Sequence, residues 1–263
     1  MKLEGKVVLL TGAGSGIGQQ LAYNLAQKGA VLLLVGRTRE KLLHTLKNCI
    51  EIGAKVDIIT ADISDLEKIP ELVETALKRF GGIDILINNA GVISFKHIEN
   101  ESTENLEKMF RTNVLAPMAI TRELIPHLKS KKEAAIVNTG SIFGSIAFAY
   151  FSVYCSTKFA MRGFSEALRR ELQDTNISVT YAAPRATKTG LASVFGQMAQ
   201  KVGMKMDDPA LVAQVIIKGL EKKRKNIYIG FPECLFVRIN SLFPGIVDSA
   251  LYKQNTVMAE FAE

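Results

Sequence analysis

Short apolar runs alternate along this chain with longer segments in which apolar residues recur every three or four positions. The runs are typical of strands buried on both faces of a parallel sheet, and the longer segments of amphipathic helices. No proline- or serine-rich linker and no internal repeat interrupts the alternation. The pattern predicts an α/β fold, with one Rossmann-type, doubly wound parallel sheet in a single domain and helices on both faces. The runs before residue 140 are 6–10, 31–35, 56–60, 83–87 and 134–139.

A glycine-rich loop follows the first apolar run, and an amphipathic helix follows the loop. Missing side chains let a backbone approach a pyrophosphate, and the N-terminus of a helix attracts an anion. The spacing is Gly-x-x-x-Gly-x-Gly, and no Gly-Lys-Ser/Thr of a P-loop is present. We expect a dinucleotide site here; the alternative is a tight turn that needs glycines. The loop residues assigned to the cofactor are Gly12, Gly14, Ser15, Gly16, Ile17 and Gly18.

The end of the second run bears on the choice of dinucleotide. NAD-binding units usually place an acid there for the ribose hydroxyls, but this chain has Gly36 followed by Arg37. An arginine attracts a 2′-phosphate that an acid would repel. The sequence therefore favours NADP(H) over NAD(H). The alternative is that Arg37 and Arg39 are solvated residues at the start of the next helix.

A possible proton-transfer group lies in the second half of the chain. Tyr154 and Lys158 are four residues apart in a segment, 153–174, that reads as a helix, so they share one face. An ammonium beside a phenol favours the phenolate, so we expect the pKa of Tyr154 to fall toward neutrality. Ser141 follows a buried strand and can donate to a developing alkoxide. The alternative is an ordinary surface pair on a helix.

Three further elements complete a recognisable pattern. Asn88, Asn89, Ala90 and Gly91 follow the fourth apolar run, Asp62 follows the third, and Asn113 lies on a long predicted helix. Together with the glycine loop and the Ser–Tyr–Lys set, these elements resemble the short-chain dehydrogenase/reductase family over about residues 3–230.

The resemblance implies a role for each matching residue. Asn113, Ser141, Tyr154 and Lys158 match the family's catalytic tetrad. Tyr154 would be the acid in reduction and the base in oxidation, and Lys158 would bind the nicotinamide ribose and lower the Tyr pKa. Ser141 would hold the substrate oxygen, and Asn113 would anchor a water. The remaining residues expected at the cofactor are Asp62, Ile63, Asn89, Ala90, Gly91, Pro184, Thr187 and Thr189.

One position departs from the family pattern. The family usually has Pro-Gly after the sixth strand, whereas this chain has Pro184-Arg185. Two interpretations of Arg185 remain open. Its side chain either turns to solvent or pairs with a nearby acid, or it binds an anionic part of the substrate or cofactor.

Apolar residues gather where the family carries a mobile substrate lid, at 191–206. Phe195 and Met198 in this segment, with Phe143, Phe148 and Arg185, are the expected substrate-lining residues. The apolar character of most of these side chains favours an apolar ketone or secondary alcohol as the substrate. The alternative is that these residues only pack in the core.

The tail forms the second part of the predicted organisation, with a catalytic domain at 1–230 and an apolar helical extension at 231–263. Pro244 predicts a break in the extension, which is too short and too charged to span a bilayer. We expect it to pack on its own domain or on a partner subunit. The alternative is peripheral membrane contact, helped by the basic cluster 222–225.

Composition bears on nucleic-acid binding, metal sites and cellular location. The net charge is +7, but no basic stripe interleaved with aromatic residues indicates nucleic-acid binding. The 3 cysteines form no Cys-x-x-Cys pair, and the 3 histidines are scattered, so no metal site is predicted. The chain opens without a basic and apolar leader, which predicts a cytoplasmic protein, with a peripheral membrane location as the alternative.

These observations lead to an NADP(H)-dependent carbonyl reductase or alcohol dehydrogenase. The resemblance implies a homodimer or homotetramer. A 3-oxoacyl-thioester reductase is the enzymatic alternative, and a non-catalytic NADPH-sensing binding module is the alternative from another class. A membrane-associated adaptor is a weaker one, resting only on the tail.

Overall fold

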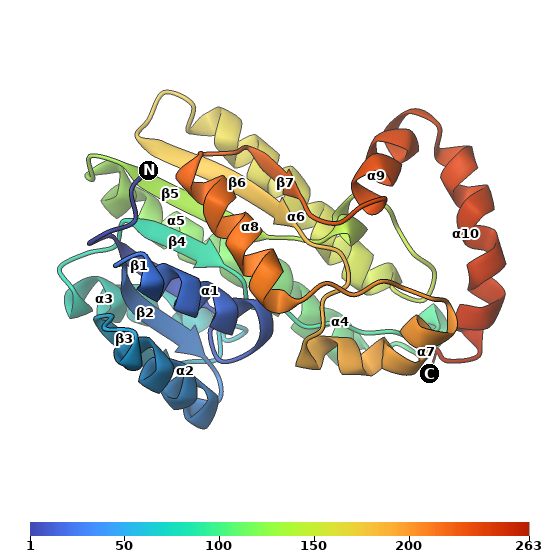
Figure 1. Cartoon of the computed structure of the whole chain (residues 1–263), viewed down its shortest axis with the longest axis horizontal. Coiled ribbons are helices and arrows are strands. Elements are labelled where there is room, and N and C mark those ends of the chain that lie inside the picture. Colours follow the sequence, from blue (N-terminus) through green and yellow to red (C-terminus); the bar gives the residue numbers. More distant parts are fainter. Residues whose placement is uncertain (263) are drawn as a thin grey trace.

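A seven-stranded parallel sheet lies between two layers of helices in the computed structural model, which describes residues 1–262 (Figure 1). The strand order is β3-β2-β1-β4-β5-β6-β7. The chain moves outward from β1 to β3 and then returns to pair β4 with β1, so the direction of winding reverses between these two strands. In such sheets the carboxyl ends of the strands at the reversal border the ligand crevice. The strands are β1 (Val7–Thr11), β2 (Val31–Gly36), β3 (Val56–Thr60), β4 (Ile85–Asn88), β5 (Ala134–Thr139), β6 (Ile177–Ala183) and β7 (Asn226–Tyr228).

Helices cover both faces of the sheet, as the sequence predicts (Figure 1). One layer contains α1 (Gly16–Gln27), α2 (Arg39–Glu51) and α8 (Pro209–Glu221). The other contains α3 (Ile69–Arg79), α5 (Ala116–Lys129) and α6 (Ser152–Glu171). Neighbouring strand residues point to opposite faces, so Leu10 packs in the first layer and Leu9 in the second, both with 0% exposure. This two-sided burial explains why the strand runs are apolar without alternation.

Asn113 lies in a widened turn rather than in a regular helix. Helix α4 (Thr103–Phe110) begins at its cap Ser102, whose side chain accepts from the Asn105 N–H. It continues through a π-turn, η3 (Arg111–Leu115), directly into α5. Such π-turns often occur at functional sites. The predicted long helix is therefore present, with one wide turn at the residue of interest.

Strands β1 and β4 begin one and two residues later than the runs at 6–10 and 83–87, and β1, β2 and β4 each end one residue later than the run that predicts them. At the amino ends of these two strands, the Asp84 carboxylate accepts a hydrogen bond from Val7 N and pairs with Lys6 at 3.2 Å. The first polar residues of the two runs are thus paired with each other just before the strands begin. The shorter elements that complete the chain are η1 (Leu66–Lys68), η2 (Ile98–Asn100), η4 (Ile142–Gly144), η5 (Gly190–Phe195) and α7 (Gly196–Lys201).

Two helices follow β7 and lie beyond the carboxyl ends of the strands (Figure 1). Helix α9 (Glu233–Leu242) contacts η4, and α10 (Pro244–Ala259) contacts α7. The predicted break at Pro244 is present. The division of the chain at residue 230 stays a prediction.

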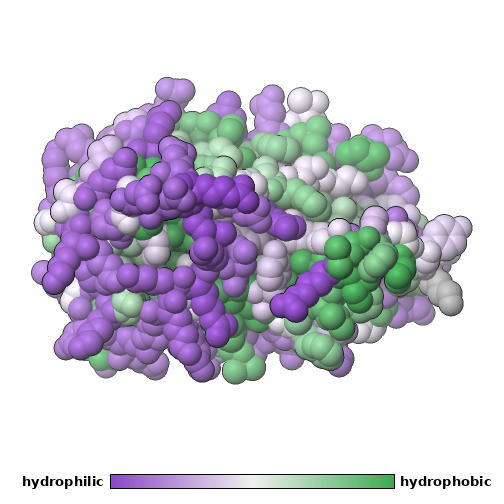
Figure 2. All heavy atoms as spheres, turned by 90° about the horizontal axis from the view of Figure 1, so that it is seen from above, coloured by the Kyte–Doolittle hydropathy of each residue, from purple (hydrophilic) through white to green (hydrophobic). Residues whose placement is uncertain are grey.

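Hydrophobic side chains gather on the surface at the end of the molecule that carries these helices (Figure 2). Within residues 1–262, no helix combines the length and the apolar character needed to cross a bilayer. The basic cluster 222–225 precedes β7, and its Lys223 pairs with Glu133 beside the start of β5. Because α9 follows β7, the basic cluster and the extension lie at opposite ends of this strand. The help that this cluster was expected to give to a membrane contact of the extension stays a prediction. The exposed apolar residues of the extension include Leu235, Leu242, Phe243 and Ile246.

Candidate active site

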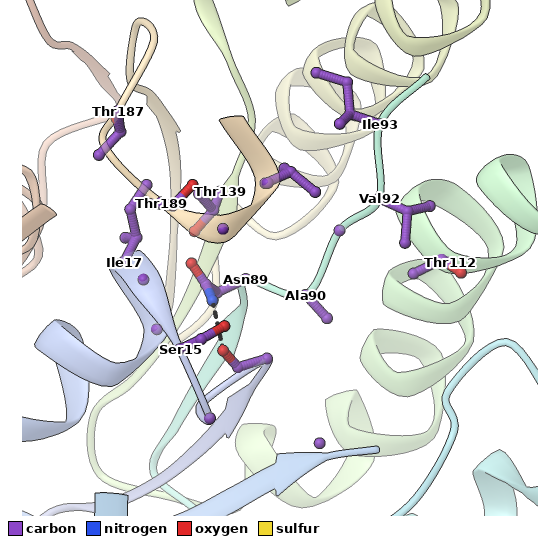
Figure 3. Close-up of a pocket in the computed structure, with 18 of the residues that line it drawn as sticks. Ser15, Ile17, Asn89, Ala90, Val92, Ile93, Thr112, Thr139, Thr187 and Thr189 are labelled. Carbon is purple, nitrogen blue, oxygen red and sulfur yellow. Dashed lines mark hydrogen bonds between the residues drawn. The ribbon is translucent and has the colours of Figure 1, made fainter. Parts of the chain in front are cut away.

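A cavity of about 480 Å³ opens at the carboxyl ends of the central strands. Figure 3 shows segments from distant parts of the chain facing one another across it, with Ile17 near Thr189 and Ile93 on another side. All the residues that the sequence assigns to the cofactor lie in its wall, together with Ser141, Tyr154 and Lys158. Asn113 lies behind the wall.

The glycine loop forms one end of the cavity and has no room for side chains. Gly12 and Gly16 have φ angles of 67° and 55°, a region that favours glycine. A Cβ on Gly12 would lie 2.7 Å from Ala90 Cα, and one on Gly18 would lie 2.1 Å from the Gly12 carbonyl oxygen. The loop therefore brings the bare N-terminus of α1 to the cavity, a shape that fits the pyrophosphate of a dinucleotide.

Thr11 joins this loop to the end of β4. Its hydroxyl accepts hydrogen bonds from Asn89 N at 3.0 Å and Ala90 N at 3.1 Å. In return, the Asn89 side chain donates to the Thr11 carbonyl oxygen at 3.1 Å. The two walls of the cavity are thus tied together by main-chain and side-chain bonds. This role of Thr11 was not predicted from the sequence, although its position at the end of β1 was the available signal.

Arg37 and Asp62 lie at the ends of β2 and β3, where the adenosine side of the cofactor is expected. Arg37 is exposed and lines the cavity. Burial opposes ionisation of Asp62, but hydrogen bonds from Ser64 N–H and its hydroxyl, with the charges of Arg37 and Lys108, outweigh burial and lower its pKa. Asp62 is therefore an acceptor, and Arg37 is a cation with room for an anionic ligand.

The Tyr–Lys pair projects from α6 into the floor of the cavity. Lys158 Nζ lies 5.5 Å from the centroid of the Tyr154 ring and donates to the Thr139 carbonyl oxygen at 3.3 Å. Both side chains are buried, with exposures of 8% for Tyr154 and 5% for Lys158. The pair is therefore not a surface pair. The Thr139 hydroxyl oxygen is also buried in this wall without a hydrogen-bond partner among residues 1–262, which fits a polar ligand.

Burial controls the ionisation of both groups. It raises the pKa of Tyr154, and the neighbouring Ser141 hydroxyl only partly offsets this. Burial also lowers the pKa of Lys158 to about 8. The expected fall of the Tyr154 pKa toward neutrality is wrong for this structure, because desolvation of the phenolate is the largest influence on it. Tyr154 is a neutral phenol, suited to donate a proton.

Ser141 and Asn113 are oriented by main-chain contacts. Ser141 Oγ accepts from Phe143 N at 3.1 Å, which leaves the hydroxyl proton available for a substrate oxygen. Asn113 Oδ1 accepts from Val92 N at 2.8 Å, and its Nδ2 donates to Val92 O at 2.9 Å. The Asn113 amide thus fixes the segment after β4, on the far side of Gly91 from the cavity.

Only some of the expected substrate residues reach the cavity. Phe143, Phe195 and Arg185 line it. Phe148 stacks behind Phe143 at 4.4 Å between ring centroids, and Met198 is buried at 1% exposure outside the wall. These two are packing residues, as the alternative interpretation held. Further apolar side chains in the wall, not predicted individually, are Ile93 and, within the predicted segment 191–206, Leu191 and Val194.

Arg185 pairs with acids instead of offering a free charge. Its guanidinium lies 2.6 Å from Asp207 Oδ1 and 2.9 Å from Glu233 Oε2. The hydrogen bond to Asp207 is the main cause that raises the pKa of Arg185, and the charge of Glu233 adds to it. Burial acts in the opposite direction but is the weaker influence. Because two carboxylates already compensate this cation, the expectation that it binds an anionic substrate or cofactor group is not favoured by the geometry.

The sequence pattern of the short chain dehydrogenases matches residues 6–200. The chain belongs to the short-chain dehydrogenase/reductase family. It is therefore an oxidoreductase of a family that acts on CH–OH and carbonyl groups.

Curated relatives and solved structures cover nearly the whole chain. An NADP-dependent 3-hydroxy acid dehydrogenase of Schizosaccharomyces pombe is 35% identical over 237 residues, 87% of this chain and 91% of its own. A ketoacyl reductase of Nostoc is 32% identical over 228 residues, 86% of this chain and 79% of its own. A Burkholderia phymatum short-chain dehydrogenase/reductase, solved with NAD, shares the fold with a TM-score of 0.87 at 24% identity, over 94% of this chain and 96% of its own.

Proposed function

We propose that this short-chain dehydrogenase/reductase is an NADP(H)-dependent carbonyl reductase, which reduces apolar ketones to secondary alcohols or catalyses the reverse reaction. The observation that carries the proposal is the burial of Ser141, Tyr154 and Lys158 together in a cavity whose other end is the glycine loop. A non-catalytic NADPH sensor would need the loop but not the buried proton donor.

The protein's own groups supply the acid–base part of the reaction. Tyr154 donates its phenol proton to the carbonyl oxygen as charge develops there, and the Ser141 hydroxyl donates a hydrogen bond to the same oxygen. The Lys158 ammonium stabilises the phenolate that Tyr154 becomes. Bound NADPH supplies the hydride. In the reverse direction the phenolate form of Tyr154 accepts the proton from the alcohol.

Support for NADP(H) comes from Arg37. It is exposed at the end of β2 and lines the cavity, and Gly36 stands where NAD-binding proteins usually carry an acid. The relative from Schizosaccharomyces pombe is named as NADP-dependent, which agrees with this preference.

Support for an apolar substrate comes from the wall near Tyr154, which is built from Phe143, Phe195 and Leu191. The alternative enzyme, a reductase of 3-oxoacyl thioesters, is supported by the name of one relative, ketoacyl reductase. The compensation of Arg185 by two acids removes the cation that would have favoured an anionic substrate.

The test is loss of cofactor absorbance, with NADPH compared to NADH, over aldehydes, apolar ketones and 3-oxoacyl thioesters. We expect NADPH-dependent turnover of apolar ketones, abolished by Tyr154→Phe while NADPH binding persists. Turnover confined to thioesters would favour the alternative. Tight NADPH binding without turnover of any class would contradict the reductase and support the sensor.

A further inference from the structure

Arg185 joins three segments that are far apart in the sequence. From the end of β6 its Nη2 donates to Asp207 Oδ1 at 2.6 Å, and its Nη1 donates to Glu233 Oε2 at 2.9 Å. Nη1 also donates to the Phe231 carbonyl oxygen at 3.1 Å. The Arg185 side chain is 14% exposed, so solvent screens these contacts only in part. One guanidinium therefore links β6, the segment before α8 and the start of the C-terminal extension.

The backbone around Arg185 is shaped to receive this side chain. Gly230 has a φ of 106°, and a Cβ there would lie 2.5 Å from Arg185 Cδ. Asp207 is fixed by its main chain as well, since its N–H donates to Ala186 O and its carbonyl accepts from Lys188 N, both at 2.9 Å. The segment 191–206, which we call the lid, is therefore closed at its base by main-chain bonds between Asp207 and the residues that follow Arg185.

The lid and the extension also meet at their far ends. Met258 of α10 is buried at 1% exposure in one apolar cluster with Met198 and Ala199 of the lid. Tyr154 belongs to the same cluster. The lid is thus fixed to the extension at two places, by the Arg185 contacts at its base and by apolar packing beside the catalytic group.

Arg185, Asp207 and Glu233 form an ionic cluster that is not optimised for stability alone. Arg185 Nε and Asp207 Oδ2 are buried without a hydrogen-bond partner among residues 1–262. Incompletely satisfied buried charges stabilise a fold less than apolar packing does, whereas they fix the relative positions of the groups they join. This balance favours a positional role for the cluster.

We propose that Arg185 is a positioning residue that sets substrate length selectivity, by holding the lid, which forms part of the wall of the substrate cavity, against the C-terminal extension. This inference rests on the proposed reductase function. A long apolar ketone gains its binding from contacts with the lid residues Leu191 and Phe195 in that wall. A short ketone contacts mainly the Ser141 and Tyr154 end and gains little from the wall.

The test compares Glu233→Gln and Arg185→Gln with Glu133→Gln. Glu133 is a matched control, because its exposure of 30% in an ion pair is close to the 28% of Glu233, and it lies at the opposite end of β7. For straight-chain methyl ketones of increasing length, we expect the two cluster variants to lose about tenfold in the preference for long over short ketones, through KM. The NADPH affinity of the two cluster variants should equal that of the unmodified protein. The control variant Glu133→Gln should match the unmodified protein in its preference for long over short ketones.

Hydrogen exchange measured by mass spectrometry supplies a readout that needs no turnover. In both cluster variants, exchange should rise in the lid and in α9 and α10, and stay unchanged in the sheet. Unchanged length preference, or unchanged exchange in the lid and extension, would overturn the inference. If the unmodified protein reduced no ketone, the proposed function would fail, and the exchange measurement would still decide whether Arg185 holds the two segments together.

Discussion

The phenol oxygen of Tyr181 lies 3.0 Å from the carbonyl oxygen of Ser141 and 3.3 Å from its amide nitrogen. Tyr181 is fully buried in β6, directly beneath the loop that carries Ser141. A Cβ on Gly140 would lie 2.1 Å from the Tyr181 ring, and one on Gly144 would lie 2.3 Å from its oxygen. Tyr181 thus occupies space that two glycines leave open, and it fixes the peptide of the serine that faces the substrate.

Tyr181→Phe should lower kcat and stability together. The ring would still fill the space, but a buried amide would lose its partner, at about 1–3 kcal/mol. Tyr23→Phe is the matched control, since its hydroxyl also has a hydrogen bond, from Asn48, but lies on α1. Turnover and thermal unfolding of both variants provide the measurement. Equal loss of kcat in the two would contradict a role of Tyr181 in placing Ser141.

The rate of carbonyl reduction should fall as pH rises through about 8. Burial lowers the pKa of Lys158 to about 8, so its ammonium is present below this pH and lost above it. Tyr154, whose pKa is raised by burial, stays protonated across this range. The falling limb therefore reports Lys158 and not Tyr154.

The pH profile of Lys158→Arg tests this assignment. An arginine stays charged throughout the range, so whatever activity remains should show no falling limb near pH 8. A limb that persists unchanged in this variant would assign the titration to another group.

Arg37→Glu should shift the cofactor preference toward NADH. Loss of a charge-assisted contact to a 2′-phosphate removes about 1.5–3 kcal/mol, so KM for NADPH should rise about tenfold or more, with little change for NADH. Arg39→Glu is the control: Arg39 is also exposed, but it opens α2 and is not in the cavity wall. A similar rise in both variants would show a general effect of surface charge.

Two glycines should respond to alanine in opposite ways. Gly18→Ala places a Cβ 2.1 Å from a main-chain oxygen, so the glycine loop must distort and NADPH binding should be lost. Gly163 is exposed in the interior of α6 with nothing within 4 Å of an added Cβ. Gly163→Ala should therefore stabilise the protein by about 0.5–1 kcal/mol. NADPH titration and thermal unfolding distinguish the two; tight binding by Gly18→Ala would contradict the close approach in the loop.

Local sequence patterns were sufficient for the first five strands of the sheet and for the cofactor end of the cavity. Each depends on residues close together in the chain: apolar runs for the strands, and consecutive glycines for the loop. The Ser–Tyr–Lys set was found for the same reason, because Tyr154 and Lys158 share one helical face and Ser141 follows a strand.

Features that depend on contacts between distant segments could not be read in the same way. The fit of Tyr181 against Gly140 and Gly144 joins β6 to the loop after β5, and no spacing rule connects them. The pairing of Arg185 needs Asp207 and Glu233, which lie 22 and 48 positions away. The direction of the Tyr154 pKa shift depends on burial, which a residue pattern does not measure.

The π-turn at Arg111–Leu115 has a consequence for how this chain can vary in length. A turn of this kind contains one residue more than a regular helix needs for the same hydrogen-bonded path. Removing one of its five residues would let a regular helical turn join α4 to α5, with the two helices kept on the same path. The change would be confined to the turn itself, where Asn113 contacts Val92. A single lost codon here would therefore spare both helices and remove the local geometry that holds Asn113.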